Sequence, residues 1–372
     1  MPLPGFFPSL SLLTQAGRLA PPQRFRTLWR AGGYRLRPPR PVPFAPILRP
    51  RQDSLLARGA AGPHQLAALL HEARSGPLPT IVLGGFVPDA TEAVFLLRGA
   101  LLRCGSLYYF NYPRRGFSTD LLLAQLSDLV DELTLVHRRP PVILAVSFGA
   151  GLLLEWLRRE RPDPARRSLR GLVLISPVAC VEDLLPRGET KPGTLLGRAL
   201  QPYLDEGIAV APGVIERSRT IFQKMFEAGA QNREALRAIL GREELLHLRS
   251  AVMHSIREID FRGACERVQS LRQLAGPAAE PGPEGRPLTA APTLILYAEK
   301  ESAVLAERSP TRAVLEHAPR AWFPRGESRL VTHRGPGGPV QHASLIFHGA
   351  DYQPLIADFY RRLKSGKVRQ AA

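Results

Sequence analysis

A serine near the middle of the chain stands where nucleophilic chemistry is possible. Residues 142–146 read Val-Ile-Leu-Ala-Val, a short apolar run that predicts a buried strand. Ser147 follows at once, and the amphipathic run after it predicts a helix. Ala145 and Gly149, two residues to either side of the serine, are small, as a strained strand-to-helix turn requires. Such a turn exposes the hydroxyl and directs the N–H of Phe148 toward the group that Ser147 would attack.

This small-x-Ser-x-small pattern resembles the nucleophile elbow of the α/β-hydrolase family, with Ala145 where the commonest form has Gly. The resemblance covers about residues 79–176 and 292–363. It implies an α/β fold with a doubly wound, mostly parallel sheet and an inserted helical cap. It also implies a Ser-acid-His triad and an oxyanion hole, the pair of N–H groups that stabilises the oxyanion of the reaction intermediate.

The resemblance places the oxyanion hole at two backbone N–H groups. Residues 79–88 read Pro-Thr-Ile-Val-Leu-Gly-Gly-Phe-Val-Pro, which predicts a strand that runs into a glycine turn. The family often has His-Gly-Phe after this strand, and Gly84 stands where His is common. The match assigns one donor to Phe86 and the other to Phe148. The alternative interpretation is a strand followed by an ordinary glycine turn.

A second motif supplies the acid. Residues 293–297 predict a strand, and Ala298-Glu299-Lys300-Glu301 follows it. This order resembles the family segment that ends in the acid of the triad, which assigns that role to Glu301. Glu299 is the alternative, and both residues could instead be solvated carboxylates in a loop.

The resemblance assigns the base to His342, a histidine on a loop just before the helix predicted over residues 352–363. Gln341 stands where the family usually has Gly. The segment between Glu301 and His342 is also long for the family, so His333 is a second candidate.

These residues imply an acyl-transfer reaction with no metal or organic cofactor. The expected activity is that of a serine hydrolase, a carboxylesterase or lipase-like enzyme that cleaves a small-molecule carboxylic ester, or a thioester or amide. A serine nucleophile argues against dehalogenase and epoxide hydrolase chemistry, which use Asp on this fold. The substitutions at Gly84 and Gln341 keep one alternative open, a catalytically inactive α/β-hydrolase-fold protein that binds or scaffolds a partner.

Alternating predicted strands and helices indicate a parallel sheet covered on both faces. A run without strands, with helices expected over 195–204, 213–228, 232–240, 242–259 and 261–274, indicates the cap. A further short helix is expected over 65–73. The expected organisation is a Pro/Arg-rich, poorly ordered segment (1–51), a hydrolase core (52–176 and 292–363), a helical cap (177–275), a linker (276–291) and a basic tail (364–372).

The 372-residue chain carries a net charge of +17, which its two ends largely supply. Nine arginines and no acid lie in residues 1–51, and five basic residues lie in 361–372, which leaves three positive charges between them. A near-neutral body argues against a specific nucleic-acid interface. No apolar run approaches the roughly 18 residues of a membrane span. Three widely spaced cysteines, Cys104, Cys180 and Cys265, indicate thiols in a reducing compartment and hence a cytoplasmic location. Nothing in the sequence indicates an oligomeric state.

Overall fold

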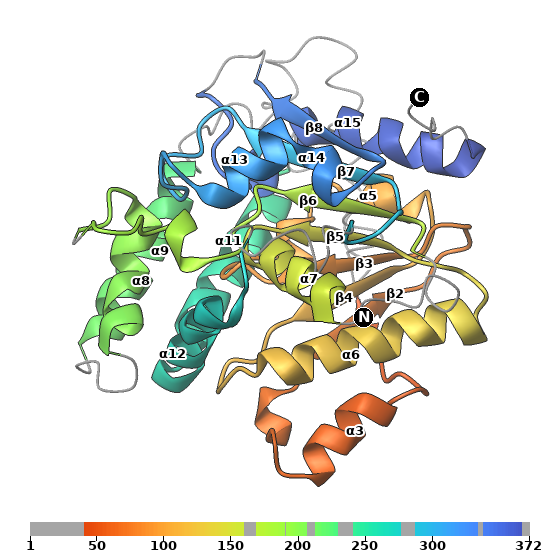
Figure 1. Cartoon of the computed structure of the whole chain (residues 1–372), viewed down its shortest axis with the longest axis horizontal. Coiled ribbons are helices and arrows are strands. Elements are labelled where there is room, and N and C mark those ends of the chain that lie inside the picture. The colour runs from red at the N-terminus through yellow and green to blue at the C-terminus, as the bar shows by residue number, and fades with distance from the viewer. Residues whose placement is uncertain are drawn as a thin grey trace, which may run out of the picture.

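The computed structural model describes residues 41–159, 169–189, 191–206, 213–229, 241–276, 287–333 and 338–366. Its centre is an eight-stranded sheet in the order β1-β2-β4-β3-β5-β6-β7-β8 (Figure 1). Strands β3 to β8 pair in parallel with their neighbours among these six. At one edge, β2 pairs antiparallel with β4, and β1 pairs antiparallel with β2. The strands are β1 (Val42–Pro43), β2 (Ala68–Glu72), β3 (Thr80–Leu83), β4 (Leu107–Asn111), β5 (Val142–Val146), β6 (Gly171–Ile175), β7 (Thr293–Ala298) and β8 (Gly326–Val331).

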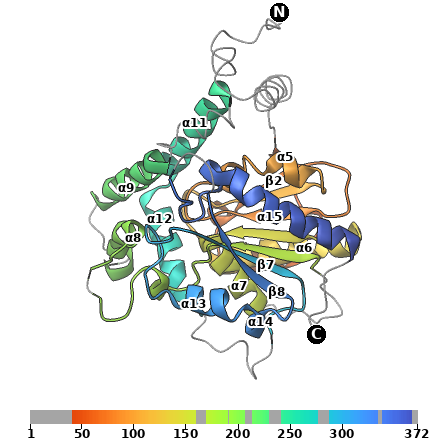
Figure 2. The same cartoon turned by 90° about the horizontal axis from the view of Figure 1, so that it is seen from above.

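Helices cover both faces of this sheet (Figures 1 and 2). The α-helices are α3 (Pro50–Ala57), α4 (Ala90–Ala93), α5 (Arg98–Leu102), α6 (Thr119–Asp131), α7 (Phe148–Arg159), α8 (Leu195–Glu206), α9 (Val214–Gly229), α11 (Arg242–Glu258), α12 (Phe261–Gln269), α13 (Pro310–His317), α14 (Pro319–Trp322) and α15 (Leu345–Ser365). Shorter helical turns are η1 (Pro63–Gln65), η2 (Glu132–Val136), η3 (Val181–Asp183) and η5 (Ser270–Gln273).

The central strands are apolar along their whole length because both of their faces are buried. In β5, Ile143 and Ala145 pack into the cluster that includes residues of α6 and α7. Leu144 and Val146 point to the other face and pack into the cluster that includes residues of α5 and α15. This arrangement confirms the predicted parallel sheet with helices on both faces.

The helix predicted over residues 65–73 is wrong. The chain instead forms η1 and then β2, which pairs antiparallel with β4. Alanine and leucine favour a helix here, but the sheet edge offers a backbone partner and tertiary pairing overrides that weak preference. The side chain of Gln125 fixes the start of this strand, since it accepts from the amide of Ala67 at 2.9 Å and donates to its carbonyl at 3.2 Å.

Between β6 and β7 the described residues contain helices and no strand. Four of the five helices predicted in this region correspond to α8, α9, α11 and α12 with η5, and the one expected over 232–240 lies outside the described residues. Helix α8 packs against α9 and α12, and α9 packs against α11. Both views show the four helices gathered at one side of the sheet (Figures 1 and 2).

Several other predictions concern residues that the structure leaves out. Most of residues 1–51, the tail from 367 and most of the expected linker lie outside the described ranges. Within those ranges, no helix combines the length and the hydropathy needed to cross a membrane. The cytoplasmic location stays a prediction from the sequence.

A buried carboxylate, Asp183, fixes the region that follows β6 and β7. Asp183 is fully buried, and its two oxygens accept five hydrogen bonds. Two of them come from the amides of Ala179 and Cys180, after β6, at 2.8 and 3.2 Å. The other three come from Ser309 and Thr311, at the start of α13, over 2.7 to 3.0 Å. The carboxylate therefore joins the loops that leave two neighbouring strands.

We expect Asp183→Asn to lower the free energy of unfolding by about 3 kcal/mol. The side-chain NH₂ of asparagine would replace one carboxylate oxygen and would face N–H and O–H groups that need an acceptor. Urea unfolding followed by circular dichroism measures the change. The matched control is Glu182→Gln, since this neighbouring carboxylate is one-third exposed and pairs with the exposed Arg187. Its loss should cost less than about 0.5 kcal/mol. Equal effects of the two substitutions would contradict a structural role for Asp183.

Candidate active site

Ser147 occupies the tight turn that its small neighbours predict. Its φ of 51° lies in the left-handed region, which a non-glycine residue rarely adopts. The turn is held by hydrogen bonds from the Ser147 amide to the carbonyl of Ile175, at 2.8 Å, and from the Val178 amide to the Ser147 carbonyl, at 3.1 Å. Gly149 is required by close packing, because a Cβ there would lie 2.3 Å from the carbonyl oxygen of Gly84.

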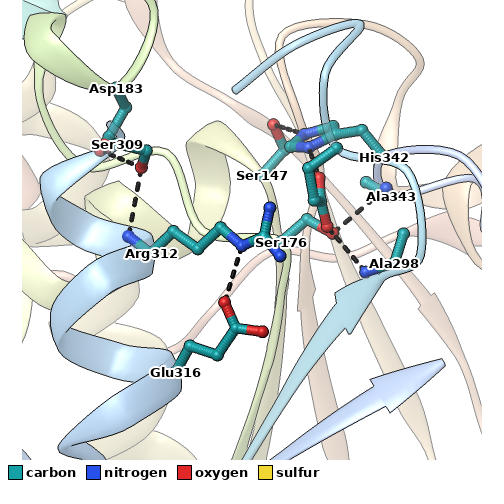
Figure 3. A network of polar contacts seen from close by, with 10 residues as sticks. Ser147, Ser176, Asp183, Ala298, Ser309, Arg312, Glu316, His342 and Ala343 are labelled. Carbon is teal, nitrogen blue, oxygen red and sulfur yellow. Dashed lines mark hydrogen bonds and ion pairs between the residues drawn. The ribbon is translucent and has the colours of Figure 1, made fainter. Parts of the chain in front are cut away.

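The three residues predicted as a triad lie in contact. His342 Nε2 is 2.9 Å from Ser147 Oγ, and Nδ1 of the same ring contacts the Glu301 carboxylate. Ser147 and His342 face one another at the edge of the sheet (Figure 3). Ser147 is 7% exposed and Glu301 is 2% exposed, so the contacts are shielded from water. These residues come from positions up to 195 apart in the sequence.

Glu301 is held by more than the histidine. One of its oxygens accepts from the amide of Ala298 at 2.7 Å and from the hydroxyl of Ser176 at 2.8 Å. Burial alone would raise the pKa of this carboxyl. His342 and the hydrogen bonds from its ring, Ala298 and Ser176 outweigh burial, so the pKa of Glu301 lies below its ordinary value. The side chain is therefore ionised at neutral pH and suited to stabilise a positively charged imidazole.

Ser176 is a residue of this site that the sequence analysis did not identify. It follows β6 directly, in a left-handed conformation with a φ of 45°. Its hydroxyl donates to Glu301 and accepts from the amide of Ala343 at 3.3 Å, next to His342 (Figure 3). Its position at the end of a predicted strand could have indicated a role in the site, because polar residues at the carboxyl ends of adjacent parallel strands meet at one edge of a sheet.

The two alternative residues lie elsewhere. The carboxylate of Glu299 accepts from the amides of His333 and Val340, at 3.0 and 3.1 Å, and so ties both ends of the loop that precedes His342. His333 Nδ1 is 2.9 Å from Asp351 Oδ2, so its ring contacts α15 and not Glu301. The geometry therefore favours Glu301 over Glu299 as the candidate acid, and His342 over His333 as the candidate base.

The two predicted oxyanion residues also lie together beside Ser147. The rings of Phe86 and Phe148 stack with their centroids 4.3 Å apart. Phe148 is the first residue of α7, where a helix amide has no acceptor within the helix. A Cβ on Gly85 would lie 3.5 Å from the Cβ of Ser147, which places the backbone before Phe86 against the serine. A Cβ at Gly84 would lie 3.0 Å from the amide nitrogen of Ala90, a tight contact that a side chain at this position would have to displace slightly.

A buried arginine from α12 binds the same loop. The two terminal nitrogens of Arg267 donate to the carbonyls of Phe86 and Pro113, each at 2.7 Å. The guanidinium also lies over the rings of Tyr112 and Phe117. Burial lowers the pKa of Arg267 to about 10, so the group is still charged at neutral pH. Sequence reasoning did not find it, since no local pattern links residue 267 to residue 86.

In the described part of the chain, no three histidine, cysteine, aspartate or glutamate side chains are grouped so that they could hold a metal ion. The three cysteines are free, and Cys180 and Cys265 are buried.

No protein-family model matches this sequence, and no curated protein matches it. The structure is similar to a putative aryl esterase from Burkholderia cenocepacia, with 14% identity, a TM-score of 0.52 and coverage of 80% of this chain and 96% of that one. It is similar to an esterase from Exiguobacterium antarcticum, with 13% identity, a TM-score of 0.52 and coverage of 79% and 96%. It is also similar to an epoxide hydrolase from Bacillus megaterium, with 11% identity, a TM-score of 0.54 and coverage of 79% and 97%. The chain therefore has the α/β-hydrolase fold.

The close packing at Gly149 gives a test of the turn. We expect Gly149→Ala to lower the free energy of unfolding by about 2 kcal/mol, because the methyl group collides with the Gly84 backbone. Gly99→Ala, in α5, is the matched control because nothing lies within 4 Å of its added Cβ. That control should raise stability by about 0.5 kcal/mol through helix propensity. A Gly149→Ala variant as stable as the wild type would show that the turn tolerates a side chain.

Proposed function

We propose that this chain, which has the α/β-hydrolase fold, is a serine hydrolase that cleaves a carboxylic ester through an acyl-enzyme intermediate. The observation that carries the proposal is the continuous set of contacts from Ser147 through His342 to the buried Glu301. A nucleophile, a base and a residue that orients the base, in hydrogen-bond reach of one another, are the parts that acyl transfer needs.

The proposed reaction begins when His342 Nε2 takes the proton from Ser147 Oγ, which attacks the carbonyl carbon of the ester. The carbonyl electrons move to oxygen, where the N–H groups of Phe86 and Phe148 stabilise the negative charge. Glu301 stabilises the protonated ring. The intermediate collapses, and the leaving alkoxide takes the proton from His342. Water then repeats the sequence on the acyl-enzyme, which releases the acid and restores Ser147.

Two further observations support an esterase over an epoxide hydrolase, the other activity named among the similar structures. Two of the similar structures are named as esterases. One is named as an epoxide hydrolase, and that chemistry on this fold uses Asp as its nucleophile, whereas this chain has Ser147. We also propose that α8, α9, α11 and α12 form the cap of the site, because α12 contacts the loop of Phe86 through Arg267.

The test is covalent labelling with a fluorophosphonate probe, which reacts with activated serines. We expect the wild type to be labelled and Ser147→Ala and His342→Ala to be unlabelled. Glu301→Gln should react about 10³- to 10⁴-fold more slowly, because the neutral amide no longer fixes the ring or stabilises its charge. Labelling rates are read from gel fluorescence over time.

Two controls make the result decisive. Glu299→Gln removes the neighbouring carboxylate and should still be labelled, since Glu299 accepts from the backbone amides of His333 and Val340, and Glu301 is the carboxylate that contacts the ring of His342. His333→Ala should also be labelled. A folded wild type that resists the probe would reject the hydrolase and favour the binding or scaffold protein. Labelling that survives His342→Ala and is lost in His333→Ala would move the base to His333.

Arg267 has a positioning role in this mechanism. Its side chain holds the carbonyl of Phe86, while the ring of that residue is held by Phe148. Phe86 is thus fixed at both its backbone and its side chain. The forked guanidinium reaches two carbonyls at once, which a lysine ammonium on a longer, flexible stem cannot reproduce. The orientation of the Phe86 N–H therefore depends on α12.

We expect Arg267→Lys to lower kcat for an activated ester about 10-fold or more, with little change in KM, because a misplaced oxyanion donor weakens binding of the transition state alone. Steady-state hydrolysis of a p-nitrophenyl ester measures both constants. The matched control is Arg262→Lys, an exposed arginine of the same helix that pairs with Glu266. A purely structural role would be indicated if the folded Arg267→Lys variant kept the wild-type kcat.

A further inference from the structure

The segments that lead into the parallel strands carry arginine and no carboxylate. Their described parts, before β3 to β8, are residues 73–79, 103–106, 137–141, 169–170, 287–292 and 318–325. These described residues contain no aspartate or glutamate, and their exposed arginines are Arg74, Arg103, Arg138, Arg139, Arg170 and Arg320. The positive charge of the body is therefore gathered in one class of loop.

The register of the sheet brings these segments together. Thr80, the first residue of β3, lies opposite Leu107 and Val142, which begin β4 and β5. Val142 lies opposite Gly171, which begins β6. The amino ends of the strands thus form one edge of the sheet, and the segments before them form one surface, the basic end of the molecule.

The basic end lies opposite the candidate active site. Ser147 follows the last residue of β5, whereas Arg138 and Arg139 precede its first residue. This strand has five residues, which at about 3.3 Å per residue separates the two ends by about 16 Å. The end of α15 belongs to the basic end, since Lys364 Nζ donates to the carbonyl of Arg103 at 3.3 Å. Figure 1 shows that end of α15 on the far side of the sheet from α8, α9 and α12.

The charge of the basic end is not neutralised by the described part of the chain. None of its six exposed arginines pairs with a described carboxylate. Three carboxylates close to this end are bound by other groups. Glu72 pairs with Arg98, and Glu327 pairs with Arg362. Glu132 is buried and accepts from two backbone amides. The arginines therefore remain available to an anionic partner.

Apolar side chains are exposed among these arginines. Leu135 and Val136, at the end of η2, are 50% and 48% exposed, and the exposed Arg138 and Arg139 follow closely. Ile47 is 77% exposed, and its amide binds a carboxylate of the same η2. Exposed aliphatic side chains next to cations are typical of surfaces that bind the interface of an anionic bilayer.

We propose that the basic end binds the surface of a bilayer that contains anionic lipids. The arginines contact lipid phosphates, and Leu135 and Val136 enter the headgroup region. Nucleic acid is the other common polyanion, and its single strands bind by stacking on aromatic rings. None of the large apolar side chains that the described residues expose is aromatic, which favours the bilayer. A chain held in this way presents Ser147 to the water and not to the lipid.

The experiment is co-sedimentation of the full chain with vesicles of phosphatidylcholine, alone or mixed with phosphatidylserine. We expect binding to the mixed vesicles only, and weaker binding as salt is raised, because salt screens the attraction. Arg138→Ala/Arg139→Ala should lower the affinity for mixed vesicles about 20-fold, since each arginine near an anionic surface contributes about fivefold. Leu135→Gln should lower it about fivefold, because less apolar surface is buried in the interface.

A matched double variant removes the same charge elsewhere. Arg187→Ala/Arg249→Ala changes two exposed arginines in the region after β6, which pair with Glu182 and Glu227. Its affinity should equal that of the wild type. Ser147→Ala should also bind as the wild type does, so the test is independent of the proposed hydrolase activity. Circular dichroism verifies that each variant is folded.

Three results would overturn the proposal. Equal losses in the two double variants would show attraction by net charge and no docking surface. Unchanged binding of Arg138→Ala/Arg139→Ala would place the contact elsewhere. Binding to a DNA duplex or an RNA strand that is tighter than binding to the mixed vesicles, and unaffected by Leu135→Gln, would assign the basic end to nucleic acid. Fluorescence anisotropy of labelled oligonucleotides measures the last of these.

Discussion

The site depends on one buried carboxylate. Glu301 binds the ring of His342, the hydroxyl of Ser176 and the amide of Ala298, so it connects the ends of two neighbouring strands with the loop after β8. Such a charge is costly to bury unless it is both paired and hydrogen-bonded, and here these partners satisfy it. A second link runs through Ser176, whose hydroxyl accepts from the amide of Ala343, the residue next to His342. The histidine is thus oriented by residues that lie just beyond the ends of β6 and β7.

The sheet follows from the sequence because fully buried parallel strands leave a strong pattern. Residues 142–146 are apolar throughout, and the small residues around Ser147 predict the turn that the structure contains. The segment over 65–73 shows the limit of this reasoning. Its composition favours a helix, and only the edge of β4, distant in the sequence, turns part of it into a strand.

The residues of the candidate site that belong to local sequence motifs could be predicted. Ser147, Glu301 and His342, which the structure brings into contact, were predicted together because each follows an expected strand or precedes an expected helix. Ser176 and Arg267 were not, since their roles arise from contacts between segments that are 125 and 181 residues apart. Whether a hydroxyl or a cation faces a distant loop is set by tertiary packing, which leaves no local pattern.

The helices after β6 are attached to the core unevenly. Helix α12 is bound closely, because the carboxylate of Glu266 accepts from the amide of Phe117 at 2.7 Å and the amide of Asp260 donates to the carbonyl of Arg114. Helices α9 and α11 share a separate apolar cluster with Phe347, at the start of α15. Helix α12 is thus tied to the loops on the side of Phe117, and α9 and α11 to the helix that follows His342.

The order of the three triad positions along the chain also bears on biosynthesis. A ribosome delivers Ser147 long before Glu301, and His342 arrives only after β8 has been made. In the proposed mechanism, the Ser147 hydroxyl has no base until that last segment docks, and is until then an ordinary weak nucleophile. Under the proposed function, a nascent or partly unfolded chain therefore carries an unreactive serine, which gains its base only when the segment after β8 has docked.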